Sequence, residues 1–341
     1  SSSYLIANAA VNLSDFEQAY KQQKIYQNSN YEIKINNQLL TLINLNKIKE
    51  AQQISKIILK KNISNEQAWI AYLTFAKINN EIFKFEEYKK ITSNLHMPLI
   101  NYIFFAKDKE VKENTKYIAR SIFEIVQAAL SKDNNYYNHN QLLFYLSIAN
   151  ILDPDFNEAY FLMAEIYQNL KNYKKSEFYY NKIALDHNLF ILSQTNIAIN
   201  KSKIGKFEEA ADQLKLLIKK NPNNFSLVLA LPDLYRVEKK YDEAINHYSK
   251  IINNVENSYK DLWYLMYLRG ICFERIGKWK LAEKDFLQSS KTSSPVCERC
   301  VCMSCSKTII EMERVFKPAG KPQFKGSGFY ETDYKKKVKP G

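Results

Sequence analysis

Apolar side chains recur along most of the chain at the spacing of amphipathic helices. In residues 157–170 they stand three or four positions apart, so they fall on one face of a helix: Tyr160, Met163, Ala164 and Tyr167. A polar turn at Lys171 and Asn172 separates this stripe from a second one, formed by Tyr173, Ser176, Tyr180 and Ile183. The pattern predicts two antiparallel helices that bury their stripes against each other.

This helix pair repeats every 34 residues. Small residues at 176, 210 and 244 stand one period apart, and an aromatic residue precedes each by three positions: Tyr173, Phe207 and Tyr241. A fourth copy carries Trp279 and Ala282, 38 residues further on. A fixed period of this length is typical of helical solenoids, so the pattern predicts an all-α solenoid of antiparallel helix pairs. We predict four clear units at 157–190, 191–224, 225–262 and 263–294, preceded by degenerate helical repeats over 1–156.

Two features of the repeats depart from a regular pattern. Asp153-Pro154 closes a degenerate unit that begins near Phe123. Pro232 stands inside a first helix, where it removes one backbone hydrogen bond and predicts a kink.

The spacing of Gly205, Phe207 and Ala210, repeated as Gly277, Trp279 and Ala282, resembles the tetratricopeptide repeat (TPR) of bacterial type over residues 1–294. The resemblance implies a right-handed superhelix whose concave groove, built from the first helix of each pair, binds an extended peptide or a helix of a protein partner. The groove positions that it implies are Phe161, Glu165, Gln168, Asn169, Thr195, Ile199, Ser202, Lys203, Leu229, Asp233, Arg236, Val237, Tyr267, Ile271, Glu274 and Arg275. The family's basic clamp on a terminal carboxylate is not expected, because Phe161, Leu162 and Glu165 occupy the matching places.

Composition agrees with a helical body and argues against several other classes. The chain has 7 Gly and 8 Pro in 341 residues, and four of each lie at or beyond Pro295. The net charge is +13, but only six of the 49 basic residues are Arg, which favours a solvated lysine-rich surface over a nucleic-acid surface. The histidines (His96, His139, His187 and His247) have no partner at metal or catalytic-triad spacing, and no phosphate-binding glycine loop is present. We therefore expect a protein that is not an enzyme.

The compartment stays open at this level. No run reaches the roughly 18 apolar residues of a membrane-spanning helix. Residues 1–4 lack an initiator Met and begin partway into a helical pattern, so we expect a missing N-terminal segment. A genuine cysteine-rich tail would favour the cytoplasm, whereas a lost signal peptide would favour the periplasm.

Residues 295–341 form a different kind of sequence, rich in cysteine and lysine. Two CxxC pairs, Cys297 with Cys300 and Cys302 with Cys305, are separated by Val301 alone. Four thiolates can close a tetrahedral Zn²⁺ site, but one intervening residue strains that geometry, so free or oxidisable thiols remain the alternative. From Cys302 to Lys336 the sequence resembles the end of the FmdB-type regulatory zinc-ribbon proteins, which implies a small irregular or β-containing tail. The closing segment of that family matches Gly326, Gly328, Phe329, Tyr330 and Tyr334.

Two functions follow from these observations. The first is a non-catalytic scaffold that binds a protein partner in the groove. The alternative is a regulator whose basic, zinc-ribbon-like tail contacts nucleic acid while the repeats recruit a partner. Because the array stops near Ser294 without a polar capping helix, we also hypothesise a fused or misjoined reading frame, with its junction between Gln288 and Val296.

Overall fold

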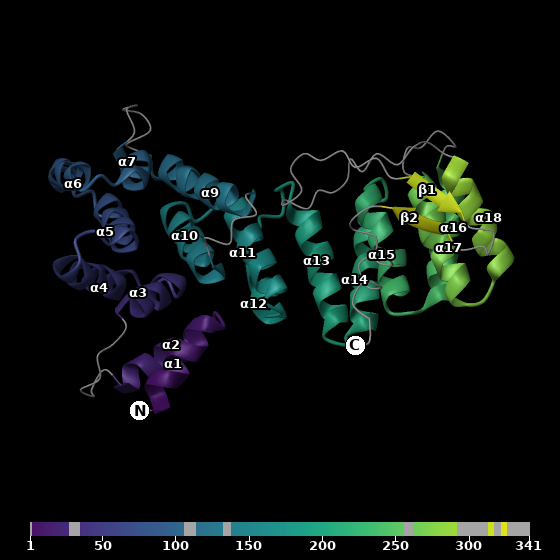
Figure 1. Ribbon diagram of the computed structural model, residues 1–341, viewed down its shortest axis with the longest axis horizontal. Coiled ribbons are helices and arrows are strands. Elements are labelled where there is room, and N and C mark those ends of the chain that lie inside the picture. Colours follow the sequence, from purple (N-terminus) through teal and green to yellow (C-terminus); the bar gives the residue numbers. More distant parts are fainter. Residues whose placement is uncertain are drawn as a thin grey trace, which may run out of the picture. The chain divides into compact units, whose positions relative to one another are not determined.

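The computed structural model describes residues 2–26, 35–105, 114–131, 138–255, 262–291, 313–316 and 322–325 (Figure 1). The chain divides into two compact units, Ser1–Ser193 and Gln194–Gly341, which we treat separately. The domain boundaries drawn from the sequence, at 156/157 and 294/295, stay predictions.

Unit 1 is built of helices that follow one another with short turns. They are α1 (Ser2–Asn12), α2 (Phe16–Tyr26), α3 (Ile35–Asn44), α4 (Ile48–Lys61), α5 (Glu66–Ile78), α6 (Ile82–Asn94), α7 (Pro98–Phe105), α9 (Thr115–Ser131), α10 (His139–Leu152), α11 (Asn157–Asn169) and α12 (Tyr173–Tyr180). Helix α13 (Phe190–Lys203) begins in this unit and continues into the next.

In the described residues, unit 2 contains the rest of α13, five further helices and two strands. The further elements are α14 (Phe207–Lys220), α15 (Phe225–Val237), α16 (Tyr241–Asn254), α17 (Leu262–Arg275), α18 (Trp279–Lys291), and the two strands, β1 (Glu313–Phe316) and β2 (Pro322–Lys325). The strands pair antiparallel, with Glu313 opposite Lys325 and Phe316 opposite Pro322. The expected all-helical body is confirmed over the described part of residues 1–291.

The turn inside each helix pair has the same backbone geometry. A residue with positive φ ends the first helix, and the amide of the next residue donates to a carbonyl five positions back. In unit 2 this bond joins Lys206 to Lys201, Lys240 to Tyr235 and Lys278 to Phe273, each at 2.9 Å. In unit 1 it closes the pairs α1–α2, α3–α4, α5–α6 and α11–α12, at the positive-φ residues Ser14, Asn46, Asn80 and Lys171. The weak repeats before residue 157 therefore share the turn of the clear ones.

Small residues lie where the two helices of a pair cross. Ser176, Ala210, Ala244 and Ala282 are all buried, as their recurrence in the sequence predicts. A larger side chain at these points would hold the helix axes apart, since close packing requires small residues at the contact. Pro232 is buried inside α15, which runs without interruption from Phe225 to Val237, and the predicted kink stays a prediction.

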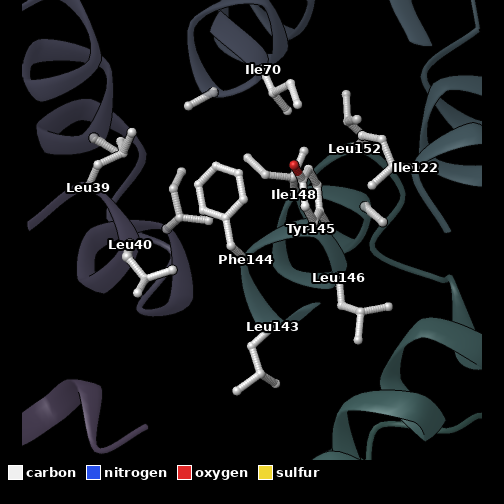
Figure 2. Close-up of a cluster of buried hydrophobic side chains, with 14 of the residues drawn as sticks. Leu39, Leu40, Ile70, Ile122, Leu143, Phe144, Tyr145, Leu146, Ile148 and Leu152 are labelled. Atoms are coloured by element: carbon white, nitrogen blue, oxygen red, sulfur yellow. The ribbon is translucent and has the colours of Figure 1, made fainter. Parts of the chain in front are cut away.

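The core of unit 1 is organised around α10. This helix packs against α3, α5, α9 and α11, and residues on all its sides are buried. Figure 2 shows Phe144 directed toward Leu40 and Ile70, while Leu143 and Leu146 point the opposite way. A helix that is apolar all round is stable only when other elements surround it. Helix α10 therefore covers α3 and α5, the first helices of two earlier pairs.

Polar contacts between distant parts of the sequence hold unit 1 together. Ser14 Oγ donates to Asn140 Oδ1 at 2.6 Å, and Asn140 Nδ2 donates to the Val11 carbonyl at 2.8 Å. Lys175 on α12 pairs with Glu17 on α2 at 2.5 Å. Unlike an ideal solenoid, in which each repeat touches only its neighbours, this unit brings its last helices back onto its first.

We predict that Gly205→Ala destabilises the protein by about 1 kcal/mol, because φ is +83° there and an L-residue in the left-handed region costs about that much. An added Cβ would meet nothing within 4 Å, so backbone strain alone is tested. Thermal unfolding followed by circular dichroism measures the change. Lys239→Ala is the control: an L-residue already adopts φ 62° at the matching turn, so its stability should be unchanged. Equal melting temperatures for Gly205→Ala and the parent would contradict this account.

Candidate functional site: the first helices of unit 2

The predicted groove residues fall in both units. Phe161, Glu165, Gln168 and Asn169 lie on α11 in unit 1, and the others lie on α13, α15 and α17 in unit 2. On α11 the Phe161 ring is buried against Tyr180, 5.4 Å between centroids, and Gln168 accepts a hydrogen bond from the Tyr180 hydroxyl. Burial raises the pKa of the Glu165 carboxyl. Three of these four side chains thus take part in packing, and their role in binding stays a prediction.

In unit 2 the last predicted position on each first helix is exposed, although Ser202, next to Lys203, is buried. The earliest predicted positions, Thr195 and Leu229, are buried, and Tyr267 is partly buried. The middle positions are partly exposed: Ile199, Asp233, Arg236, Ile271 and Glu274. The last positions, Lys203, Val237 and Arg275, are exposed, and we call these three residues the exposed edge. A partner of unit 2 would therefore meet the C-terminal ends of its first helices.

Asp233 and Arg236 form a network with a tyrosine from the second helix of their pair. The Tyr248 hydroxyl donates to Asp233 Oδ1 at 2.5 Å, and Arg236 donates to the same oxygen from Nη2 at 3.1 Å. Arg236 Nε also donates to the Tyr248 hydroxyl at 3.2 Å. Burial is the main cause that raises the pKa of Tyr248, and the Asp233 charge adds to it. Burial by itself lowers the pKa of the Arg236 guanidinium. The interactions with Tyr248 and Asp233 outweigh burial, so the pKa is raised. The two charges at this point of the face thus neutralise each other.

Neighbouring first helices are linked at this level. Ser202 Oγ on α13 donates to Glu238, the residue that caps α15. On α17 the Cys272 thiol is buried, and burial raises its pKa to about 12, with smaller opposing effects of Arg236 and Asp233. A thiol with so high a pKa is no nucleophile at neutral pH.

A buried ion pair attaches α18 to α17. Arg269 donates from Nε and Nη2 to the two carboxylate oxygens of Asp285, each at 2.7 Å, and from Nη1 to Ser249 Oγ at 3.1 Å. Asp285 is buried. With the contact to Ser249, this bidentate pair joins α16, α17 and α18.

The sequence analysis missed Glu238, Tyr248, Arg269 and Asp285. Arg269 could have been found, because it is the first charge in the otherwise apolar run that opens α17 and such a charge needs a partner. Tyr248 gave no such signal, since tyrosine fills several packing positions of the repeats.

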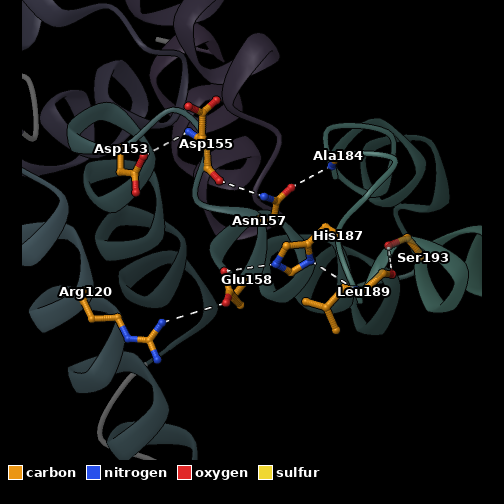
Figure 3. Close-up of polar contacts among 9 residues, drawn as sticks. All are labelled: Arg120, Asp153, Asp155, Asn157, Glu158, Ala184, His187, Leu189 and Ser193. Carbon is orange, nitrogen blue, oxygen red and sulfur yellow. Dashed lines mark hydrogen bonds and ion pairs between the residues drawn. The ribbon is translucent and has the colours of Figure 1, made fainter.

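A polar cluster in unit 1 brings one histidine to a carboxylate. His187 Nε2 lies 3.9 Å from Glu158, and Arg120 lies 4.0 Å from the same carboxylate (Figure 3). Asn157 accepts a hydrogen bond from the Ala184 amide at 2.8 Å and so fixes the loop after α12. No partner of His187 is evident from sequence spacing, and the loop after α12 brings it to Glu158.

The metal and membrane findings concern only the described part of the chain. Within it, no group of three His, Cys, Asp or Glu residues is arranged to hold a metal ion, and no helix is long and apolar enough to cross a membrane. The proposed Zn²⁺ ligands lie outside the described residues: Cys297, Cys300, Cys302 and Cys305. The part of the proposed junction that follows Lys291 also lies outside them. Both stay predictions.

Comparisons with known proteins show likeness only among solved structures. No family model and no curated protein matches the chain. A tetratricopeptide repeat protein from Parabacteroides merdae is 17% identical, over 76% of this chain and 92% of its own, with a TM-score of 0.37. MamA is 16% identical over 52% and 91%, with a TM-score of 0.39. YrrB, described as a TPR protein with an unusual peptide-binding site, is 15% identical over 52% and 84%, with a TM-score of 0.35. Values this low carry no argument about function, so the functional argument rests on the chain's own residues.

We predict that Asp285→Ala lowers the free energy of unfolding by about 3 kcal/mol, because it leaves the Arg269 guanidinium partly buried without its counter-ion. Asp242→Ala serves as the matched control. Asp242 pairs with Lys278 at 3.6 Å with both side chains exposed, and its loss should cost less than about 1 kcal/mol. Urea unfolding of both variants measures the difference. Equal losses would show that the buried pair does not hold α18.

Proposed function

We propose that the chain is a protein-interaction scaffold that binds an extended peptide or a helix across α13, α15 and α17. The observation that carries the proposal is the exposed edge, where Lys203, Val237 and Arg275 end three neighbouring first helices. A row of side chains from successive repeats matches a segment that runs across the repeats.

The chemistry of this face suits a partner with apolar and acidic residues. Val237 is 65% exposed and offers an apolar contact, with Ile199 and Ile271 partly exposed on the flanking helices. Asp233 is paired with Arg236. Lys203 and Arg275 are the cationic residues of the exposed edge. Glu274 is the acidic residue on the same face of α17. Opposite charges across an interface raise association rates and select partners, so acidic segments are favoured.

The alternative function, a nucleic-acid-binding regulator, depends on residues 295–341. The structure describes only the backbone of β1 and β2 in that segment, and no described contact favours this function. A labelled DNA duplex that bound the full chain, dissociated steeply with salt, and was lost on deletion of residues 295–341 would favour the alternative.

We predict that Val237→Asp weakens peptide binding at least tenfold, because it replaces the exposed apolar contact with a charge that repels acidic segments. A displayed library of random 16-residue peptides, selected on the full chain, supplies the probes, and fluorescence anisotropy measures each Kd. We expect selected peptides to be enriched in acidic and apolar residues.

The matched control is Leu216→Asp, which makes the same change at a 55% exposed position on α14, a second helix. It should alter Kd less than twofold. Failure to select any peptide, or equal weakening by both variants, would overturn the proposed function.

A further inference from the structure

The outer face of α12 presents an aromatic ring between two lysines. Phe178 is 56% exposed, whereas Ser176 and Tyr180, on the other side of the helix, are buried. Lys174 stands four residues before Phe178 and therefore lies on the same face. Lys182 follows Phe178 by four residues, and its Nζ lies 5.2 Å from the centre of the Phe178 ring. Both lysines are exposed, so this face combines an apolar surface with positive charge.

The loop after α12 holds a leucine in solvent. The Ala184 amide donates to Asn157 Oδ1 at 2.8 Å, and the Leu189 amide donates to His187 Nδ1 at 3.2 Å (Figure 3). Leu185 lies between these two hydrogen-bonded points and is 81% exposed, more than any other large apolar side chain in the described residues. A hydrogen-bonded loop thus keeps this leucine out of the core.

Acidic side chains leave the two lysines unpaired. Glu17 on α2 forms its ion pair with Lys175, which points away from the exposed face and is partly buried. In the described part of the chain, neither Lys174 nor Lys182 forms an ion pair. Residues 171–186 contain four lysines and two acidic residues, so the segment is net positive. An anionic partner therefore complements this surface.

Three classes of anionic partner differ in how well they match these side chains. Lysine is depleted in protein–protein interfaces, which favour arginine for contacts with carboxylates. A nucleic acid would contact the lysines and stack a base on Phe178, but it would gain nothing from Leu185. A membrane surface uses every group, because lysines attract anionic headgroups while phenylalanine and leucine enter the boundary between headgroups and acyl chains.

We propose that Lys174, Phe178, Lys182 and Leu185, which we call the α12 strip, bind the surface of a membrane that contains anionic phospholipids. Leu185 is three residues beyond Lys182, so their Cα atoms are at most about 11 Å apart and both side chains reach one lipid surface. Two apolar side chains give a peripheral, reversible contact. The strip lies in unit 1 and is independent of the peptide-binding face proposed in unit 2.

Co-sedimentation of the full chain with phospholipid vesicles tests the proposal. We expect binding to phosphatidylcholine vesicles that contain about 30% phosphatidylglycerol, little binding to phosphatidylcholine alone, and release as salt screens the charges. Phe178→Ala and Leu185→Ala should each lower the partition coefficient at least about threefold, because each removes an apolar side chain from the lipid contact. Tyr102→Ala is the matched control. Tyr102 is 51% exposed but donates a hydrogen bond to Glu124 at 3.4 Å, so its loss should change nothing.

A charge-reversal experiment separates the strip from the overall charge of the chain. The double variant Lys174→Glu, Lys182→Glu should lower the partition coefficient at least about tenfold, because the strip then repels anionic headgroups. The double variant Lys49→Glu, Lys60→Glu makes the same change in net charge at two exposed positions on α4 and should lower it less than about twofold. Equal losses would show that net charge alone drives binding and would overturn the proposal.

A tryptophan introduced into the strip tests direct contact with lipid. Brominated acyl chains should quench the added fluorescence of Phe178→Trp on vesicles, and should leave that of Tyr102→Trp unquenched. Circular dichroism confirms that each variant keeps its helices. Absence of binding to anionic vesicles, binding unaffected by Phe178→Ala and Leu185→Ala, or absence of quenching would overturn the proposal. A single-stranded oligonucleotide that binds the parent but not Phe178→Ala, without vesicle binding, would assign the strip to nucleic acid instead.

Discussion

Each helix pair whose connecting turn is described, from α1–α2 to α17–α18, depends on one residue in the left-handed conformation between its two helices. That residue ends the first helix, satisfies its last carbonyls through a 6→1 hydrogen bond, and reverses the chain so that two apolar stripes meet. The bond is present from Ser14 in the first pair to Gly277 in the last. Because the turn is short and fixed, the second helix has almost no freedom in where it lies, and a buried small residue such as Ala210 or Ala244 completes the contact.

The same turn leaves the first helices of the two units in different surroundings. In unit 1, α10 covers α3 and α5, and hydrogen bonds from Asn140 and Ser147 secure it to the N-terminal helices. The face that would line a groove there is occupied by the chain itself. In unit 2 the first helices end in exposed side chains. Which surface of the first helices stays exposed therefore depends on what packs onto them. The repeat pattern alone does not determine this packing.

The helix pairs of residues 157–291 were predicted from the sequence, because small and aromatic residues that must pack recur at matching positions in each repeat. It predicted a polar turn at Lys171 and Asn172, but no pattern indicates that Lys171 and Lys239 adopt the left-handed conformation that Gly205 and Gly277 adopt. It did not predict the place of α10. A run such as Leu142–Ile148 is apolar in every direction, so its periodicity cannot say which helices surround it. The contact of Lys175 with Glu17 joins residues 158 positions apart, and no local pattern encodes such a pairing.

At the candidate site, which stays a prediction, the pairing of two charges follows from the sequence, but their contact with a third residue does not. Asp233 and Arg236 are three residues apart on a helix, so their pairing follows from spacing alone. Their connection to Tyr248 depends on the second helix of the pair, and it changes what the face offers to a partner. The Asp233 carboxylate already accepts hydrogen bonds from Arg236 and Tyr248, so it is less available to a cationic ligand. The Arg236 guanidinium is in turn less available to an anionic ligand. In the proposed function, selectivity therefore depends more on the exposed edge, where Lys203 and Arg275 stand on either side of Val237, than on the middle of the first helices.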